Sequence, residues 1–116
     1  MSQFTNGNVK TFFASGAIPQ FSRVKLVAGL LAVAAAADAD IGIAEIAAFA
    51  SGDAIPVRLR TAAGTYKCIA SAAIAQGAEV YADANGEVGV TNTNPAFGTA
   101  LDAVSGAGSI VEVLRF

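Results

Sequence analysis

The sequence repeats itself at an offset of 56 residues, and this repeat constrains the fold more than any other feature of the chain. Residues 14–24 (ASGAIPQFSRV) align with residues 70–80 (ASAAIAQGAEV), and six of these 11 pairs are identical. Over residues 14–60 and 70–116, 12 of 47 aligned pairs are identical, where about 4 are expected by chance from the composition. The alternative is coincidence in an alanine-rich chain, but the clustered match at 14–24 favours a duplicated unit.

The repeat decides between helix and strand for a segment that is ambiguous by itself. Residues 30–50 are rich in alanine and favour a helix locally. The aligned residues 86–98 contain glycines, Pro95 and β-branched residues, which make a very poor helix. If both copies share one backbone, both consist of strands and loops.

We therefore predict short strands at matching places in both copies. They are expected at 23–28, 31–35, 41–47 and 55–60, at 79–83, 87–91, 97–104 and 110–115, and as a bridging strand at 65–70. A tight turn is expected at Asn85-Gly86, because both residue types tolerate positive φ. Short strands punctuated by glycine are typical of a small barrel or sandwich. The predicted fold is all-β, with a pseudo-duplication (about 14–60 and 70–116) inside a single domain over residues 13–116.

Two strands alternate apolar and basic residues, which predicts the side chains that face the core. The apolar set is expected to point inward: Val24, Leu26, Val57 and Leu59. The basic set is expected on a solvated outer face, with a local ligand surface as the alternative: Arg23, Lys25, Arg58 and Arg60.

The last strand carries apolar residues where the first copy has charges. Leu114 and Phe116 align with Arg58 and Arg60. Two explanations stay open. A β-bulge at Ile110 could change which side chains face the core, or Leu114 and Phe116 could form an apolar surface that meets another chain.

Composition argues against catalysis and against a nucleic-acid partner. The chain has no histidine, which removes the usual proton shuttle, the commonest metal ligand and every Ser-His or Cys-His nucleophile. Its formal net charge is −2, so no global basic field exists to hold nucleic acid. We therefore expect no enzyme, no cofactor and no direct nucleic-acid contact.

Individual candidates for metal or membrane binding are equally weak. Cys68 is the single cysteine and alternates with its neighbours like a strand residue, so it is expected to be a small buried hydrophobe. Asp38 and Asp40 lack the rest of a calcium loop and are expected in a solvated turn. The longest run without polar residues, 26–37, has 12 residues, below the ~18 of a membrane span. We expect no metal ion and no membrane association.

Three segments carry a resemblance to a known family. They are residues 78–88 (AEVYADANGEV), residues 97–103 (FGTALDA) and, behind the turn at Gly108, residues 110–113 (IVEV). Together they resemble the capsid cement (head decoration) family of tailed bacteriophages. Residues 22–28 (SRVKLVA) are more loosely similar to the lambda-type head decoration proteins.

The resemblance implies a small β protein, often a homotrimer, on the outer surface of the mature phage head. There it would bridge neighbouring major capsid subunits and stabilise the shell, after synthesis in the host cytoplasm. Such a role requires a rigid body with several contacts that act together. The alternative is a non-enzymatic glycan- or peptide-binding β module of a virion fibre or cell surface, against which the low aromatic content of 8% counts.

The N-terminal segment, residues 1–12, is predicted to be an arm outside the repeat. The hypothesis is that this arm orders on the capsid or on a neighbouring subunit, adding an edge strand and docking Phe4. The alternative is a frayed terminus. Phe12 and Phe13 could anchor the arm, with one of them in the core. The predicted capsid or subunit contacts are Phe4, Val9, Phe12, Phe13, Leu114 and Phe116.

Overall fold

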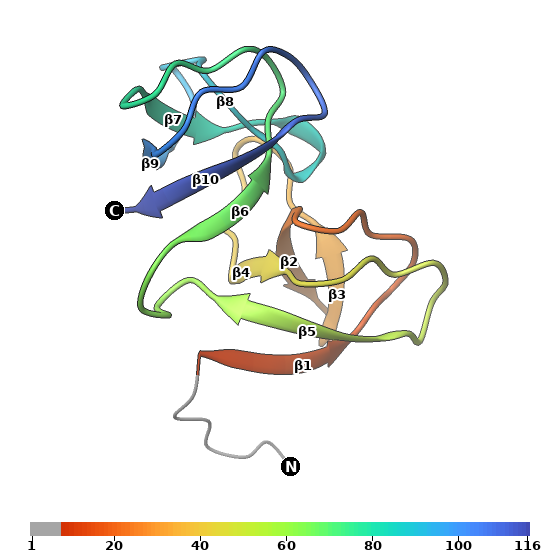
Figure 1. Cartoon of the computed structure of the whole chain (residues 1–116). Coiled ribbons are helices and arrows are strands. Elements are labelled where there is room, and N and C mark those ends of the chain that lie inside the picture. The colour runs from red at the N-terminus through yellow and green to blue at the C-terminus, as the bar shows by residue number, and fades with distance from the viewer. Residues whose placement is uncertain (1–7) are drawn as a thin grey trace.

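The computed structural model describes residues 8–116, which fold into two antiparallel five-stranded sheets (Figure 1). The first sheet has the order β1-β5-β4-β2-β3 and consists of β1 (Val9–Phe13), β2 (Arg23–Val27), β3 (Leu30–Val33), β4 (Gly42–Ala44) and β5 (Ala54–Leu59). The second has the order β6-β10-β9-β7-β8 and consists of β6 (Tyr66–Ile69), β7 (Glu79–Ala82), β8 (Val88–Gly89), β9 (Ala96–Ala100) and β10 (Ile110–Arg115). A 3-10 turn, η1 (Ala84–Gly86), joins β7 to β8. Within residues 8–116, no helix has the length and apolar character needed to span a bilayer.

The two sheets are copies of one topology, which confirms the predicted duplication. The two strand orders are the same, and adding 56 to the residues of β5 gives β10 residue for residue. The Gln20 side-chain amide donates to the Glu45 carbonyl at 3.0 Å. The Gln76 amide donates to the Leu101 carbonyl, the equivalent acceptor, at 3.2 Å. The identical residues Gln20 and Gln76 therefore make the same contact in both copies.

Each sheet curls until its two edge strands meet. Ala14, directly after β1, forms a parallel bridge with Leu31 of β3. In the second sheet, Ala70 follows β6 and forms the corresponding bridge with Val88 of β8. Each half thus resembles a small curled barrel, and the predicted all-β class is confirmed.

The ambiguous alanine-rich segment, residues 30–50, contains β3, β4 and connecting loops, as the repeat predicted. The Asn-Gly turn is also confirmed, because Asn85 (φ 61°) and Gly86 (φ 72°) both adopt left-handed backbone. The sequence-based prediction lacks β1, in which Val9–Phe13 pair with β5. The strand β1 occupies the position that the bridging strand β6 has in the second copy.

Each sheet encloses its own apolar core, and the two cores are in contact at β4. Buried residues of the first core are Ala14, Ile18, Val24, Leu31, Ala44, Ala48, Ile55 and Val57. The second core contains Tyr66, Cys68, Ala70, Ile74, Val80, Val88, Phe97, Ala100, Val111 and Val113, together with Ile43 from the first sheet. Ile43 therefore joins the two halves through apolar packing.

The alternation along β2 predicted Val24 correctly and Leu26 wrongly. Val24 is fully buried, whereas Leu26 is 42% exposed. The reason is the short pairing of β2 with β4, which involves only Arg23 and Val24. Beyond Val24, β2 pairs with β3 alone, and their hairpin extends past the core.

The prediction that Arg23 lies on a solvated face is also wrong, because this side chain is fully buried between the two halves. Its Nε donates to the Glu87 carbonyl at 3.1 Å. Its Nη2 donates to the carbonyls of Ala35 (3.1 Å) and Asp83 (2.6 Å). Burial lowers the pKa of the guanidinium, because desolvation disfavours the charged form, although nearby Asp40 opposes this shift. The β7–β8 turn of the other copy thus covers the outward face of β2 at Arg23.

Asp40, for which a solvated turn was expected, is buried and forms an ion pair with Arg115 between the two halves. Its carboxylate accepts two hydrogen bonds from Arg115, at 2.8 and 3.0 Å. The Arg115 guanidinium also lies 4.1 Å from the centroid of the Phe97 ring. Asp38 instead remains near the surface, where a hydrogen bond from Lys25 (2.6 Å) lowers the pKa of its carboxyl. Of the other basic residues, Arg58 is half-buried and Arg60 is exposed.

Cys68 is buried in the second core, as predicted, and its thiol should be inert until the protein opens. Burial raises the pKa of this thiol to about 12, because the apolar surroundings disfavour the thiolate. We expect a thiol reagent such as 5,5′-dithiobis(2-nitrobenzoate) at pH 8 to modify the folded protein at least about 100-fold more slowly than the urea-unfolded chain. Folding raises the pKa of the thiol, so the folded state favours the protonated form. The free energy of unfolding should therefore be unaffected by this group below the pKa of the unfolded thiol, and should fall as the pH rises from there toward 12. Rapid native-state modification at pH 8 would contradict the closed second core.

Candidate interaction surface

The predicted contact residues of the N-terminal segment occupy an edge strand. Val9 (43% exposed) and Phe13 (58%) lie on the outward side of β1. Phe12 points the other way and packs against the first core. Phe4 lies outside the described residues. Among residues 8–116, β1 pairs along its length only with β5, so it is an edge strand of the first sheet.

The predicted contact residues of the last strand form a second exposed pair. Val111 and Val113 of β10 are buried, whereas Leu114 is 49% and Phe116 is 73% exposed. The register of β10 with β6 is continuous from Ile110 to Val113, so a bulge at Ile110 does not explain the pattern. Leu114 and Phe116 therefore form an exposed apolar pair, and their contact with another chain stays a prediction. The structure does not place this pair on the same sheet as Val9 and Phe13.

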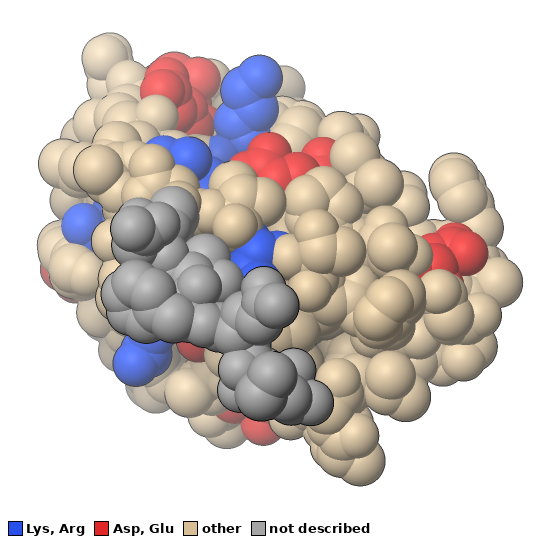
Figure 2. Space-filling model, turned by 90° about the horizontal axis from the view of Figure 1, so that it is seen from below, with Lys and Arg blue, Asp and Glu red and all other residues tan. Residues whose placement is uncertain are grey.

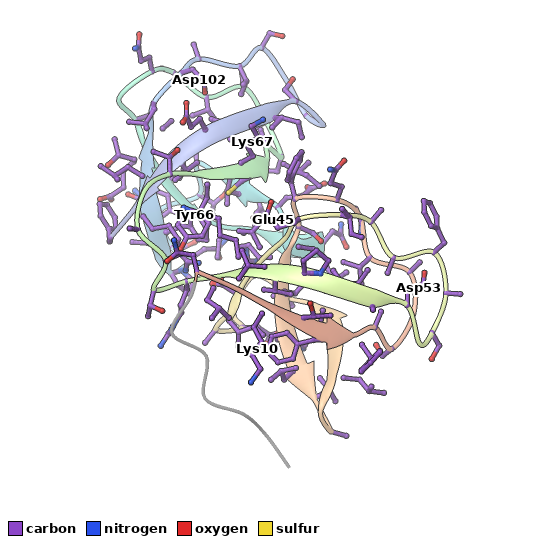
Figure 3. The ribbon with its side chains drawn as sticks, turned by 60° about the horizontal axis from the view of Figure 1, so that its bottom comes forward. Lys10, Glu45, Asp53, Tyr66, Lys67 and Asp102 are labelled. Atoms are coloured by element: carbon purple, nitrogen blue, oxygen red, sulfur yellow. The ribbon has the colours of Figure 1, made fainter. Side chains whose placement is uncertain are left out.

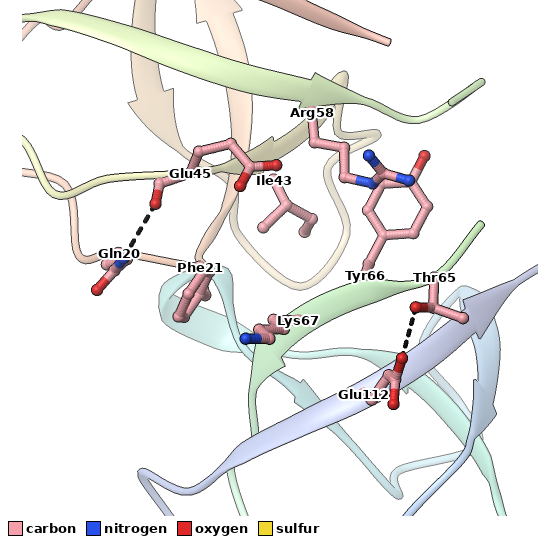
Figure 4. A pocket seen from close by; sticks show the side chains of 9 residues that line it. All are labelled: Gln20, Phe21, Ile43, Glu45, Arg58, Thr65, Tyr66, Lys67 and Glu112. Atoms are coloured by element: carbon pink, nitrogen blue, oxygen red, sulfur yellow. Dashed lines mark hydrogen bonds between the residues drawn. The ribbon is translucent and has the colours of Figure 1, made fainter. Parts of the chain in front are cut away.

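A cleft of about 500 Å³ opens between the two halves (Figure 4). Its lining residues are Gln20, Phe21, Ile43, Glu45, Arg58, Thr65, Tyr66, Lys67 and Glu112. Strands β4 and β5 form one wall and β6 forms the other (Figure 4). The cleft combines two cationic and two anionic side chains with three large apolar ones, and so has no single charge preference.

The groups in the cleft are largely engaged with one another. The Arg58 guanidinium lies 5.0 Å from the centroid of the Tyr66 ring and donates to the Ala63 carbonyl. The Thr65 hydroxyl donates to Glu112 at 2.6 Å. Burial raises the pKa of Tyr66, because desolvation disfavours the phenolate, and its hydroxyl donates to the Leu59 carbonyl. Among residues 8–116, no three His, Cys, Asp or Glu side chains are grouped so that they could hold a metal ion.

Charged side chains of both signs lie on the face shown in Figure 2. Blue and red groups are next to one another near its upper edge, and much of the rest of this face is uncharged. Such a surface suits association with another protein more than electrostatic binding to a polyanion.

The most exposed large apolar side chain of the described residues was not predicted from the sequence. Phe49, in the loop between β4 and β5, is 86% exposed. Ile46 in the same loop is also exposed. The repeat contained a signal for this loop, because Ile46 and Phe49 align with the polar residues Asp102 and Ser105.

Comparison with known families gives one match that spans both halves. A family model described as phage cement protein matches residues 4–115, nearly the whole chain. The matched range includes the three segments that carry the resemblance noted from the sequence. No curated protein matches the chain in sequence.

Proposed function

Because the chain belongs to the phage cement protein family, we propose that it decorates the outer surface of the phage head as a homotrimer and bridges neighbouring major capsid subunits. The role is passive. Buried interface between the capsid and the bound protein lowers the free energy of the assembled shell and slows its disassembly. The observation that carries the proposal is the family match over residues 4–115.

The distribution of exposed apolar residues supports a bridging role. Val9 and Phe13 lie on the first sheet, and Leu114 and Phe116 on the second. Arg23 and the Arg115–Asp40 pair hold the two sheets in a defined orientation. A rigid body with separate contact sites gains avidity, because the first contact raises the effective concentration of the next to the mM range.

The predicted arm belongs to the same proposal. We infer that the N-terminal segment, with Phe4, extends along a neighbouring subunit or the shell and leads into the edge strand β1. The alternative function, a glycan- or peptide-binding module, gains no support from the cleft. Its Tyr66 ring, the natural platform for a sugar, already stacks with Arg58 at 5.0 Å.

Binding to heads that lack the protein tests the proposed function. We expect wild-type protein to co-sediment with such heads up to a fixed number of copies per head, and to sediment alone as a trimer. The doubly substituted variant Leu114→Arg, Phe116→Arg carries the residue type found at the aligned positions of the first half, and should bind at least about tenfold more weakly. Ile110→Ala is the matched control, because Ile110 is exposed on the same strand and aligns with Ala54. Failure of the wild-type protein to saturate the heads would contradict the proposal.

A further inference from the structure

The loop between β4 and β5 presents an aromatic side chain to solvent at one end of the molecule. Phe49 is 86% exposed, and every residue from Ile46 to Gly52 is uncharged. The loop lies at the end of the first half that is farthest from the second half (Figure 1). In Figure 3 it is marked by Asp53, while Asp102 marks the equivalent loop of the other copy, in a different part of the molecule.

The repeat provides an internal control that separates folding from function. In the second half, Ser105 occupies the position of Phe49, and Asp102 that of Ile46. Both loops are nevertheless held by the same bridge, between Ile18 and Ala48 in one half and between the aligned pair in the other. The fold therefore does not require an aromatic residue at this position, and a solvent-exposed phenyl ring contributes little to stability.

The backbone of the loop is held in place before any partner binds. The main-chain N–H groups of Phe49 and Ala50 both donate to the Asp53 carboxylate, at 2.8 and 3.1 Å. The N–H of Ala48 and the N–H of Ile18 each donate to the other's carbonyl at 2.9 Å. Because these contacts already order the loop, docking Phe49 would lose little conformational entropy.

The chemistry of the loop identifies the kind of partner. An uncharged loop with a protruding phenyl ring fits an apolar pocket. Two cavities formed by residues 8–116 both contain charged side chains and are a poor match for this loop in a second copy. The first cavity contains four charged side chains beside its apolar ones: Glu45, Arg58, Lys67 and Glu112. The second, of about 350 Å³, contains Asp40 and Arg60 beside Ile41 and Leu59. A phenyl ring that entered either would desolvate charged groups without replacing their hydrogen bonds.

We propose that Phe49 is a preformed anchor that inserts into an apolar pocket on the major capsid protein. This inference rests on the proposed function and adds a contact residue to it. The anchor lies on a different loop from β1 and from the end of β10, so it adds a further point of attachment. Buried aromatic anchors of this kind carry a large share of the binding energy of an interface.

The test is the single substitution Phe49→Ser, which introduces the residue of the aligned position. We expect this variant to bind decoration-free heads at least tenfold more weakly than the wild type. Its thermal midpoint should stay within about 2 °C of the wild type, because the side chain is exposed. Its oligomeric state should be unchanged. Leu101→Glu is the control. It changes an exposed residue of the second half to the residue found at the aligned position, Glu45. This variant should bind the heads within about twofold of the wild type.

Each remaining outcome decides against the inference in a distinguishable way. If wild-type protein binds the heads and Phe49→Ser binds them equally well, Phe49 is not an anchor, while the proposed function stands. If Phe49→Ser loses the trimeric state, the occupant of the contact is a second copy and not the capsid protein. If the wild-type protein itself does not bind heads, the proposed function fails and the inference fails with it.

Discussion

Arg23→Ala is expected to lower the free energy of unfolding by about 3–5 kcal/mol, among the largest effects of any single substitution in this protein. The side chain is fully buried and donates three hydrogen bonds to main-chain carbonyls. Two of these acceptors, Asp83 and Glu87, flank the β7–β8 turn of the second half. Alanine would remove one donor from each of the three carbonyls, although those of Ala35 and Glu87 would keep a main-chain N–H donor, and it would open a cavity between the halves.

The internal repeat supplies the control for this experiment. Glu79 aligns with Arg23, begins β7 and is exposed, so Glu79→Ala should change the free energy of unfolding by less than about 0.5 kcal/mol. Urea denaturation followed by circular dichroism would measure both variants. Equal effects of the two substitutions would show that Arg23 does not hold the halves together. Burial of the charged guanidinium has a desolvation cost, which also lowers the pKa of Arg23. For this reason the expected loss of unfolding free energy is smaller than the summed strength of three hydrogen bonds from a charged donor.

Gly98→Ala is expected to be comparably severe, with a loss of about 3 kcal/mol or more. An added Cβ would lie 2.2 Å from the Leu114 carbonyl oxygen, a main-chain atom of the neighbouring strand that cannot rotate away. The same holds in the first half, where a Cβ on Gly42 would lie 2.1 Å from the Arg58 carbonyl oxygen. Either substitution must therefore push two paired strands apart.

Gly16→Ala is the matched control for these two substitutions. No atom lies within 4 Å of a Cβ built at Gly16, and its backbone is not in the left-handed region. Gly16→Ala should therefore leave the thermal midpoint within a few degrees of the wild type, or raise it slightly. If Gly42→Ala and Gly98→Ala melt like Gly16→Ala, the close approach of the strands in both halves is incorrect.

The repeat made much of the topology predictable, because identical residues mark shared backbone requirements. Gly42 and Gly98 are identical because neighbouring strands approach closely, and Gln20 and Gln76 because each binds the same loop carbonyl. The strand β1 was missed because residues 9–13 share no identity with residues 65–69. Subtracting the offset of 56 from the predicted strand at 65–70 would have located it.

The errors at Arg23 and Asp40 have a common physical cause. Alternation along a strand shows only that two faces differ, and not what covers the outer one. Arg23 is covered by a turn about 60 residues away, and Asp40 pairs with Arg115, which is 75 residues away. Both contacts form where one copy packs on the other. The repeat predicts the fold within each copy, and no local sequence pattern shows which residues of the two copies meet.

Contact residues were the least predictable part of the candidate surface. Leu114 and Phe116 were predicted because the other copy has arginines at the aligned positions, and both side chains are exposed in the structure. The same comparison distinguishes Phe49 from the aligned Ser105. Phe49 lies in the alanine-rich segment 30–50, however, whose pattern does not indicate which side chains are exposed. Exposed apolar residues such as these satisfy no packing requirement of the fold, and the comparison between the two copies is the sequence signal that distinguishes them.

The central claim is that this protein stabilises the phage shell, and the release of DNA from heated heads tests it most directly. DNA-filled heads that lack the protein would be heated with a DNA-binding dye, with and without saturating wild-type protein. The account predicts that release shifts upward by several degrees in the presence of the protein, in proportion to the number of bound copies. An unchanged release temperature at full occupancy would contradict it.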